Sequence, residues 1–186
     1  KATRSADDPM NFAYIPCAPT RAAVAFDEVV SAANVFGGIW ENGAGAIYAE
    51  NQVVDWLKEN LGWPEEAIGT FVSGGTYGNL SALACARDNA KNKWEAENIY
   101  PKGRPSEGYK LIISKDTHSS VRTIAKVLDV DVLIADTDDK ARMTGESVKK
   151  LIEANDGVFA VVATCGTTNT GTIDDIDSIS KVCKEY

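Results

Sequence analysis

Three polar stretches decide the fold: Ser73-Gly74-Gly75-Thr76-Tyr77-Gly78-Asn79-Leu80, then Thr117-His118-Ser119-Ser120-Val121, then Ala163-Thr164-Cys165-Gly166-Thr167-Thr168. Each follows an apolar run that is typical of a buried strand, and each is followed by a helical pattern. In a parallel sheet, loops of this kind meet at the carboxyl edge, where open α/β folds bind their ligands. We therefore expect all three stretches at one ligand-binding edge.

Outward from these stretches, extended and helical patterns alternate along the whole chain. The expected strands are 70–72, 110–114, 130–135 and 158–164, and the expected helices are 21–35, 47–61, 77–98, 118–128, 145–154 and 174–186, with a loop rich in Pro and Gly at 101–108. Strands separated by helices imply right-handed crossovers. The predicted fold class is α/β, a mainly parallel sheet with helices on both faces.

Composition limits the function classes. The 186 residues are 44% hydrophobic and 25% charged, as in an ordinary soluble globular protein. The 27 acidic and 19 basic residues give a net charge of −8, which argues against nucleic acid or an anionic membrane as partner. No apolar stretch approaches the roughly 20 residues of a membrane span, and residues 1–11 lack a secretory signal. A soluble cytoplasmic protein is expected.

The four cysteines do not indicate a metal site. Cys17, Cys85, Cys165 and Cys183 lie far apart, and none forms a C-x-x-C pair. Neither a zinc site nor a disulfide framework is predicted. We expect reduced, mostly buried thiols.

The glycine turn has the features of an anion site. Gly74 and Gly75 lie between an extended run and a helix, where backbone N–H groups can close on a phosphate at the helix N-terminus. Ser73 and Thr76 can add hydroxyl donors. In isolation such a turn is more often an ordinary loop. The pattern is neither G-x-G-x-x-G nor a P-loop, which argues against a nucleotide.

His118 is the only histidine of the chain and follows an expected strand at the start of a helix. A single histidine is usually structural. Its position one strand beyond the glycine turn favours a functional role, in which the imidazole lies on a planar ligand and takes part in proton transfer. The third stretch, taken alone, is equally well an ordinary polar loop.

The ordered set resembles the group II pyridoxal-phosphate (PLP) dependent decarboxylases, the family of aromatic amino-acid, glutamate and histidine decarboxylases. Two further segments support the resemblance: Phe12-Ala13-Tyr14-Ile15-Pro16 is similar to the family's substrate-pocket segment, and Trp40 with Ala49-Glu50-Asn51 through Trp56-Leu57 is similar to its first large-domain helix. Five matches in order are more specific than any one of them.

The resemblance implies a fold type I PLP enzyme that decarboxylates an L-amino acid to the amine and CO₂. Ser73, Gly74, Gly75 and Thr76 would hold the phosphate, His118 would stack on the pyridine ring and act in catalysis, and Thr168 would contact the ring substituents. Tyr14, Ile15, Pro16 and Cys17 would face the substrate. Residues 1–20 would end an N-terminal arm, and residues 21–186 would form the first part of the PLP-binding large domain. Family members form homodimers with the site at the interface.

Two groups that the chemistry needs are not recognisable. The family's pyridine-nitrogen aspartate and Schiff-base lysine would follow Tyr186, so this piece alone is expected to be inactive. Lys115 and Lys126 are poor substitutes, and Asp174 and Asp175 are predicted helix caps. Cys17 and Gly38 depart from the residues usual in aromatic-substrate members, which leaves the substrate open. The alternatives are another fold type I PLP enzyme, a lyase or aminotransferase, and a non-catalytic assembly half-domain.

Overall fold

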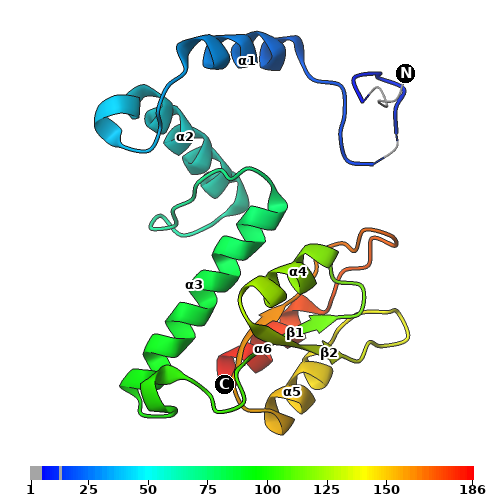
Figure 1. The fold of residues 1–186 in the computed structure, drawn as a ribbon. Coiled ribbons are helices and arrows are strands. Elements are labelled where there is room, and N and C mark those ends of the chain that lie inside the picture. Colours follow the sequence, from blue (N-terminus) through cyan, green and yellow to red (C-terminus); the bar gives the residue numbers. More distant parts are fainter. Residues whose placement is uncertain (1–5, 13) are drawn as a thin grey trace. The chain divides into compact units, whose positions relative to one another are not determined.

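A computed structural model describes residues 6–12 and 14–186 of the chain. The chain forms two compact units, Lys1–Phe71 and Val72–Tyr186, and each is described by itself. Figure 1 traces the order of the elements. Among the described residues, no helix is long and apolar enough to cross a membrane.

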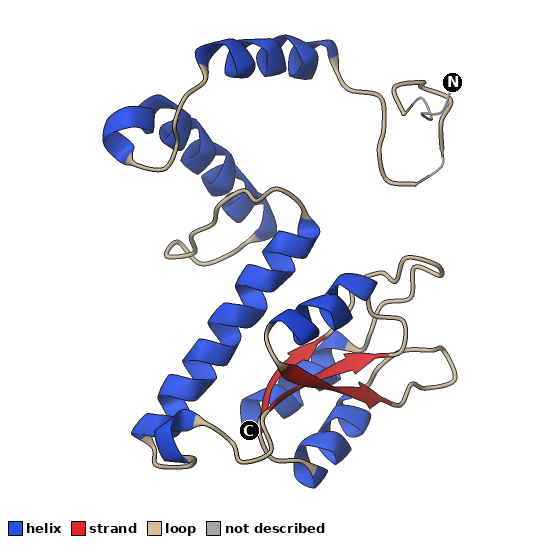
Figure 2. Cartoon of the chain, in the orientation of Figure 1, coloured by secondary structure: helices blue, strands red, loops and turns tan. Residues whose placement is uncertain are grey.

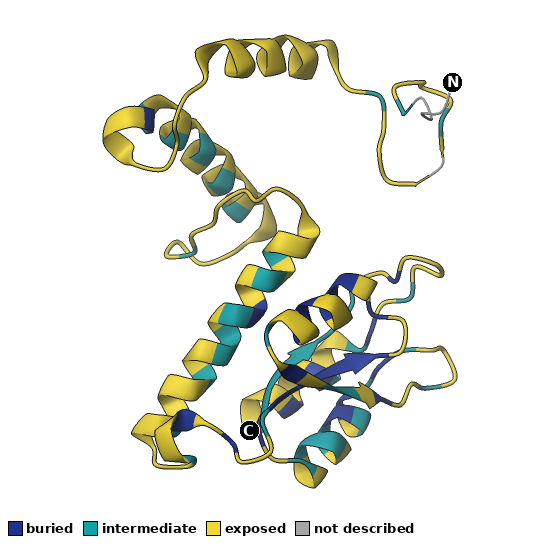
Figure 3. Cartoon of the chain, in the orientation of Figure 1, coloured by how far each residue is buried: buried dark blue, intermediate teal, exposed yellow. Residues whose placement is uncertain are grey.

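The first unit contains α1 (Arg21–Ala33) and α2 (Trp40–Leu61). The Thr20 hydroxyl accepts the Ala23 N–H at 3.1 Å and begins α1. No residue of α1 is buried, and Figure 3 shows the helix exposed along its length. α2 begins seven residues earlier than the pattern predicted, at Trp40 instead of Ile47, and contains a kink at Gly43. A Cβ at Gly43 would lie 2.5 Å from the Phe36 carbonyl oxygen, so only glycine allows this close approach.

The expected strand at 70–72 is wrong. These residues lie in a loop and pair with no strand in the described chain. Instead, the Glu50 carboxylate on α2 accepts the Phe71 N–H at 2.6 Å and the Thr70 hydroxyl at 2.9 Å. The apolar face of α2 that carries Val54 and Leu57 borders the segment 63–71 around a pocket of about 180 Å³. Thr70 and Phe71 therefore lie against α2 and do not belong to a sheet.

The second unit is built on a three-stranded parallel sheet (Figure 2). Its strands are β1 (Tyr109–Ser114), β2 (Val130–Ala135) and β3 (Val158–Val162), in the order β2-β1-β3. The register pairs Ile112 of β1 with Leu133 of β2 and with Val161 of β3. The prediction of a parallel α/β sheet is confirmed.

Helices cover both faces of this sheet, as Figure 1 shows. α3 (Gly75–Ala96) and α4 (Ser119–Val127) pack with Leu111 and Ile113 of β1 on one face. α5 (Gly145–Ala154) and α6 (Ile176–Glu185) pack with Ile112 on the other. Because side chains alternate along a strand, β1 supplies both cores and is buried throughout (Figure 3). A 3₁₀ turn, η1 (Pro101–Gly103), lies in the expected loop at 101–108.

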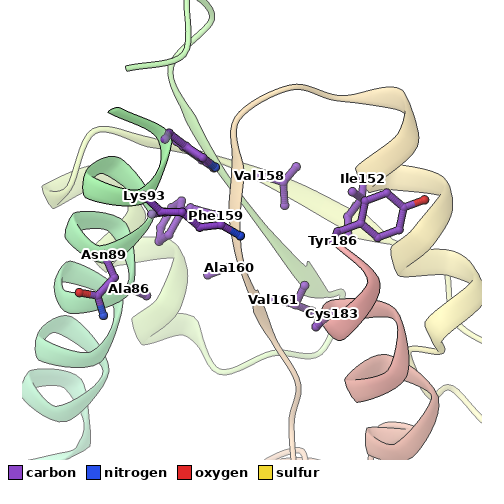
Figure 4. A pocket seen from close by; sticks show the side chains of 12 residues that line it. Ala86, Asn89, Lys93, Ile152, Val158, Phe159, Ala160, Val161, Cys183 and Tyr186 are labelled. Atoms are coloured by element: carbon purple, nitrogen blue, oxygen red, sulfur yellow. The ribbon is translucent and has the colours of Figure 1, made fainter. Parts of the chain in front are cut away.

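One edge of β3 is unpaired in the described chain and borders a pocket of about 550 Å³ between α3 and α6 (Figure 4). Cys183 of α6 lies on this pocket, and partial burial raises the pKa of its thiol. The expectation of mostly buried thiols is wrong, because Cys17, Cys85, Cys165 and Cys183 are all exposed. All four are free, as predicted. Cys17 and Cys165 lie in loops, and Cys85 lies on an exposed position of the helix that spans residues 75–96.

Candidate active site

The glycine turn leaves the N-terminus of α3 open. Gly74 is the N-cap, with φ of 128° and ψ of 160°, a conformation that only glycine adopts without strain, and no side chain caps the helix. The first backbone bonds run from the Tyr77 and Gly78 N–H groups to the Gly74 carbonyl. Within the described chain, the N–H groups of Gly75 and Thr76 therefore have no acceptor. Ser73 to Thr76 are exposed, so an anion can reach the turn.

His118 lies immediately before α4 as its N-cap. Its Nδ1 accepts the Ser120 N–H at 3.2 Å and lies 2.8 Å from the Ser120 hydroxyl oxygen. The Asn79 amide on α3 donates to that same hydroxyl oxygen at 3.1 Å. The imidazole is thus exposed to solvent but fixed through one nitrogen. In residues 6–12 and 14–186, Nε2 has no hydrogen-bond partner.

The third stretch leaves β3 and forms a loop that Thr167 organises. Thr167 is 6% exposed. Its hydroxyl oxygen accepts the Thr172 N–H at 3.1 Å and lies 2.7 Å from the Thr170 hydroxyl oxygen. Thr168, the residue predicted to contact the ring, is exposed at the start of the turn. The loop therefore presents Thr168 to solvent while its neighbour holds the backbone.

Asp174 closes this loop and does not cap α6. Its carboxylate is 3% exposed and accepts the Met143 N–H and the Thr164 N–H, both at 2.8 Å. Asp175 is the N-cap, since its side chain accepts the Ser178 N–H at 3.3 Å. The cap prediction is confirmed for Asp175 and wrong for Asp174. Sequence reasoning did not predict these two hydrogen bonds of the Asp174 carboxylate, which we call the Asp174 clamp, because Met143 is remote along the chain.

The structure brings two of the three stretches to the carboxyl edge as expected. The segment 117–121 follows β1, and the segment 163–168 follows β3. The glycine turn follows no strand, which corrects that part of the expectation, but the Asn79–Ser120 bond places the first turns of α3 beside α4. A pocket of about 310 Å³ is lined there by residues that include Asn79, Val121 and Ala163. The described chain has no hydrogen bond between Thr168 and either His118 or the glycine turn.

The remaining predicted residues lie elsewhere. Tyr14 to Cys17 belong to the first unit and are exposed, with Tyr14 at φ of 67°. Ala13, which shares their segment, lies outside the described residues. Lys115 and Lys126 are exposed. No cluster of potential metal ligands occurs in the part of the chain that the structure describes.

Comparison with known proteins assigns the family. The family profile described as "Pyridoxal-dependent decarboxylase conserved domain" matches residues 2–186. The chain is 34% identical to an aromatic-L-amino-acid decarboxylase of Bacillus atrophaeus over 96% of this chain and 36% of that protein. It is 31% identical to an L-2,4-diaminobutyrate decarboxylase of Acinetobacter baumannii over 96% of this chain and 38% of that protein.

Solved structures agree with this assignment. The crystal structure of Rhodiola rosea 4-hydroxyphenylacetaldehyde synthase matches with a TM-score of 0.81 at 25% identity, over 97% of this chain and 40% of that one. Mouse CSAD matches with a TM-score of 0.76 at 26% identity, over 91% of this chain and 36% of that one.

The fold is that of the fold type I, pyridoxal-dependent enzymes. The chain belongs to the pyridoxal-dependent decarboxylase family, as its resemblance to the group II enzymes indicated. It spans about 36–38% of the length of these two curated relatives.

Proposed function

We propose that this chain forms the phosphate- and ring-binding part of a PLP-dependent carboxy-lyase that converts an L-amino acid to its amine and CO₂. One observation carries the proposal: the open N-terminus of α3 and the fixed imidazole of His118 are joined by the bond from Asn79 to Ser120. Such an arrangement suits a ligand with an anionic group at one end and a flat ring at the other. Family membership supports PLP as that ligand.

The residues present fit the phosphate. Two free N–H groups at the start of a 22-residue helix, and a turn where added Cβ atoms at Gly74 and Gly75 would meet open space, leave room for a close anion. The hydroxyls of Ser73 and Thr76 are exposed beside them. In this proposal the helix dipole and these donors stabilise the phosphate charge without a basic side chain.

His118 and Thr168 are proposed to contact the ring. When bound, the cofactor supplies an electron sink for the pair left behind as CO₂ departs. The imidazole of His118 orients the ring by stacking, and its Nε2 can hold or move a proton at a ligand atom. Thr168 offers an exposed hydroxyl from the neighbouring loop. Residues Tyr14 to Cys17 are proposed to face the substrate.

The substrate class is an L-amino acid. The relatives named above are an aromatic-L-amino-acid and an L-2,4-diaminobutyrate decarboxylase, so their side chains differ widely. We propose decarboxylation as the shared reaction and assign no particular side chain. We also retain the proposed division at residue 20, with an N-terminal arm before it and the PLP-binding domain after it.

A cytoplasmic homodimer is the proposed form of the complete protein. Four free thiols suit a reducing compartment. Phe26, Val29 and Val30 on α1 are 60–70% exposed in a helix with no buried residue, which suits coverage by a second copy. Light scattering of the purified protein tests the dimer, and a monomer across micromolar concentrations would contradict it.

The activity is tested with the protein that contains this chain, PLP and a panel of L-amino acids. We expect PLP-dependent release of amine and CO₂ from at least one of them. His118→Ala should lower kcat about 10²–10⁴-fold while weakening PLP binding much less. Lys115→Ala, an exposed change in the same loop, is the control. Tight PLP binding without decarboxylation of any amino acid would overturn the proposal.

A further inference from the structure

A polar chain links α3, α4 and the imidazole beneath the proposed site. The Asn79 amide donates to the Ser120 hydroxyl oxygen at 3.1 Å, and that oxygen lies 2.8 Å from Nδ1 of His118. The Ser120 backbone N–H also reaches Nδ1, at 3.2 Å. Ser120 is 6% exposed, so water does not compete freely for its hydroxyl.

The direction of each hydrogen bond follows from what the groups can donate. A backbone N–H can only donate, so Nδ1 of His118 acts as the acceptor. The Asn79 N–H uses a lone pair on the Ser120 oxygen and leaves the hydroxyl hydrogen available to Nδ1. Both donors then meet at one nitrogen. In the neutral ring, the proton belongs on Nε2.

We propose that Asn79 and Ser120 are positioning residues, which hold His118 as the Nε2–H tautomer and fix its ring relative to the N-terminus of α3. This inference rests on the proposed function, in which His118 contacts the cofactor ring. Nε2, which has no partner in the described chain, is presented to a ligand as a proton donor in the neutral imidazole.

The bond between Asn79 and Ser120 also couples the two halves of the site. Asn79 lies in the helix whose first N–H groups face the proposed phosphate, and Ser120 lies in the first turn of α4. A shift of α3 would pull the Ser120 hydroxyl from Nδ1. The phosphate end and the ring end are therefore set by one chain of hydrogen bonds and not by two separate loops.

The first test needs no cofactor. Nitrogen-15 NMR of the ring reports which nitrogen carries the proton, and the signals of His118 are identified by their loss in His118→Gln. We expect a protonated Nε2 and a hydrogen-bonded Nδ1 in the neutral ring. Ser120→Ala should increase the Nδ1–H fraction and so move the Nδ1 resonance toward that of a protonated ring nitrogen. Ser120→Thr, which retains the hydroxyl, should restore the original spectrum.

Matched controls separate this effect from general disturbance of the helices. Ser119→Ala removes the neighbouring exposed hydroxyl and should leave both ring resonances in place. Asn79→Asp cannot donate and instead accepts the Ser120 hydroxyl hydrogen, so the Nδ1 resonance should move as in Ser120→Ala. Asn92→Asp makes the same charge change at an exposed position of α3 and should have no effect. A protonated Nδ1 in the unmodified protein, or ring resonances that Ser120→Ala leaves unmoved, overturns the inference.

The second test uses the complete enzyme with PLP. Ser120→Ala should lower kcat about tenfold and leave the PLP dissociation constant within about twofold. The double variant His118→Ala/Ser120→Ala should be no slower than His118→Ala, because Ser120 acts through the imidazole. Additive losses would overturn the positioning role. Absence of decarboxylation in the unmodified protein would refute the proposed function alone, since the ring resonances are read without substrate or cofactor.

Discussion

Asp174 and Thr164 are joined by two hydrogen bonds, from the Thr164 N–H to Oδ2 of Asp174 at 2.8 Å and from the Asp174 N–H to the Thr164 carbonyl at 3.0 Å. The pair closes the base of the loop that carries Thr168. The other carboxylate oxygen of Asp174 accepts the Met143 N–H. One buried carboxylate therefore ties the end of β3 to the segment that leads into α5.

Asp174→Asn should destabilise the fold by about 1–3 kcal/mol, because an amide keeps one acceptor and turns an N–H₂ group toward a backbone donor. Chemical unfolding measures the change. Asp156→Asn, at an exposed position, is the control and should have little effect. Both variants lose one negative charge, so equal stability would show that the hydrogen bonds of the Asp174 carboxylate add nothing to the free energy of unfolding.

Gly74→Ala should weaken PLP binding while leaving the fold intact. A Cβ at Gly74 meets no atom within 4 Å, but φ of 128° is strained for alanine by about 1–3 kcal/mol. The turn should rearrange and misplace the N–H groups of Gly75 and Thr76. We expect an increase of about tenfold in the PLP dissociation constant, measured by absorbance titration. Unchanged affinity would separate the phosphate from this turn, and Gly37→Ala, in open space, serves as control.

Gly145→Ala should destabilise the contact of α5 with α6. An added Cβ would lie 2.5 Å from the Ser178 carbonyl oxygen, and the Gly145 N–H donates to the Ser178 hydroxyl at 2.8 Å. Thermal or urea unfolding should show a loss of about 1–3 kcal/mol. Gly45→Ala places the same methyl group in open space on α2 and should be neutral or stabilising by up to about 1 kcal/mol. Similar results for both would contradict the close approach.

Glu50 should make part of the first unit sensitive to acid. The Phe71 N–H, and then the Thr70 hydroxyl, lower the pKa of its carboxyl below the ordinary 4.5. A carboxyl whose pKa is lower in the folded state stabilises fully above its ordinary pKa, and this stabilisation is lost as pH falls through the lowered value.

The measurement is hydrogen exchange at the Phe71 amide between neutral pH and about pH 3, below the ordinary carboxyl range, with rates corrected for the intrinsic pH dependence of exchange. Protection should decline in the acid range in the unmodified protein, and Glu50→Gln should remove most of that decline. Glu59→Gln, an exposed change on the same helix, should preserve it. A decline that survives Glu50→Gln would assign the acid sensitivity to another group.

The sequence predicted the second unit more closely than the first. β2 and α5 have the predicted bounds, and β1 and α4 differ from them by a residue or so at their ends, because apolar runs bounded by polar loops leave little ambiguity. The early start of α2 was missed, since glycines at 43 and 45 weaken a helical pattern and only the approach to Phe36 explains Gly43. The strand expected at 70–72 failed because local side-chain type does not reveal whether a partner strand is present.

The candidate site was predicted in its parts but not in its connections. His118 was singled out from its position between a strand and a helix, and the glycine turn from its glycines before a helix, although the strand expected before the turn is absent from the described chain. Asn79, Ser120 and the clamp at Asp174 were missed, because their partners lie up to 41 residues away and hydrogen bonds of that span leave no local pattern. The roles of the glycine turn, His118 and Thr168 toward PLP stay predictions.

The strand order β2-β1-β3 also bears on how the polypeptide assembles during synthesis. β1 precedes both of its neighbours along the chain, so the central strand leaves the ribosome first and each later strand finds one of its edges free. β2 can pair once residues 130–135 have emerged, with α4 already available to cover one face, and β3 then adds on the opposite side. The three described strands can assemble from the middle of the sheet outward, and none of the three has to insert between two that have already paired.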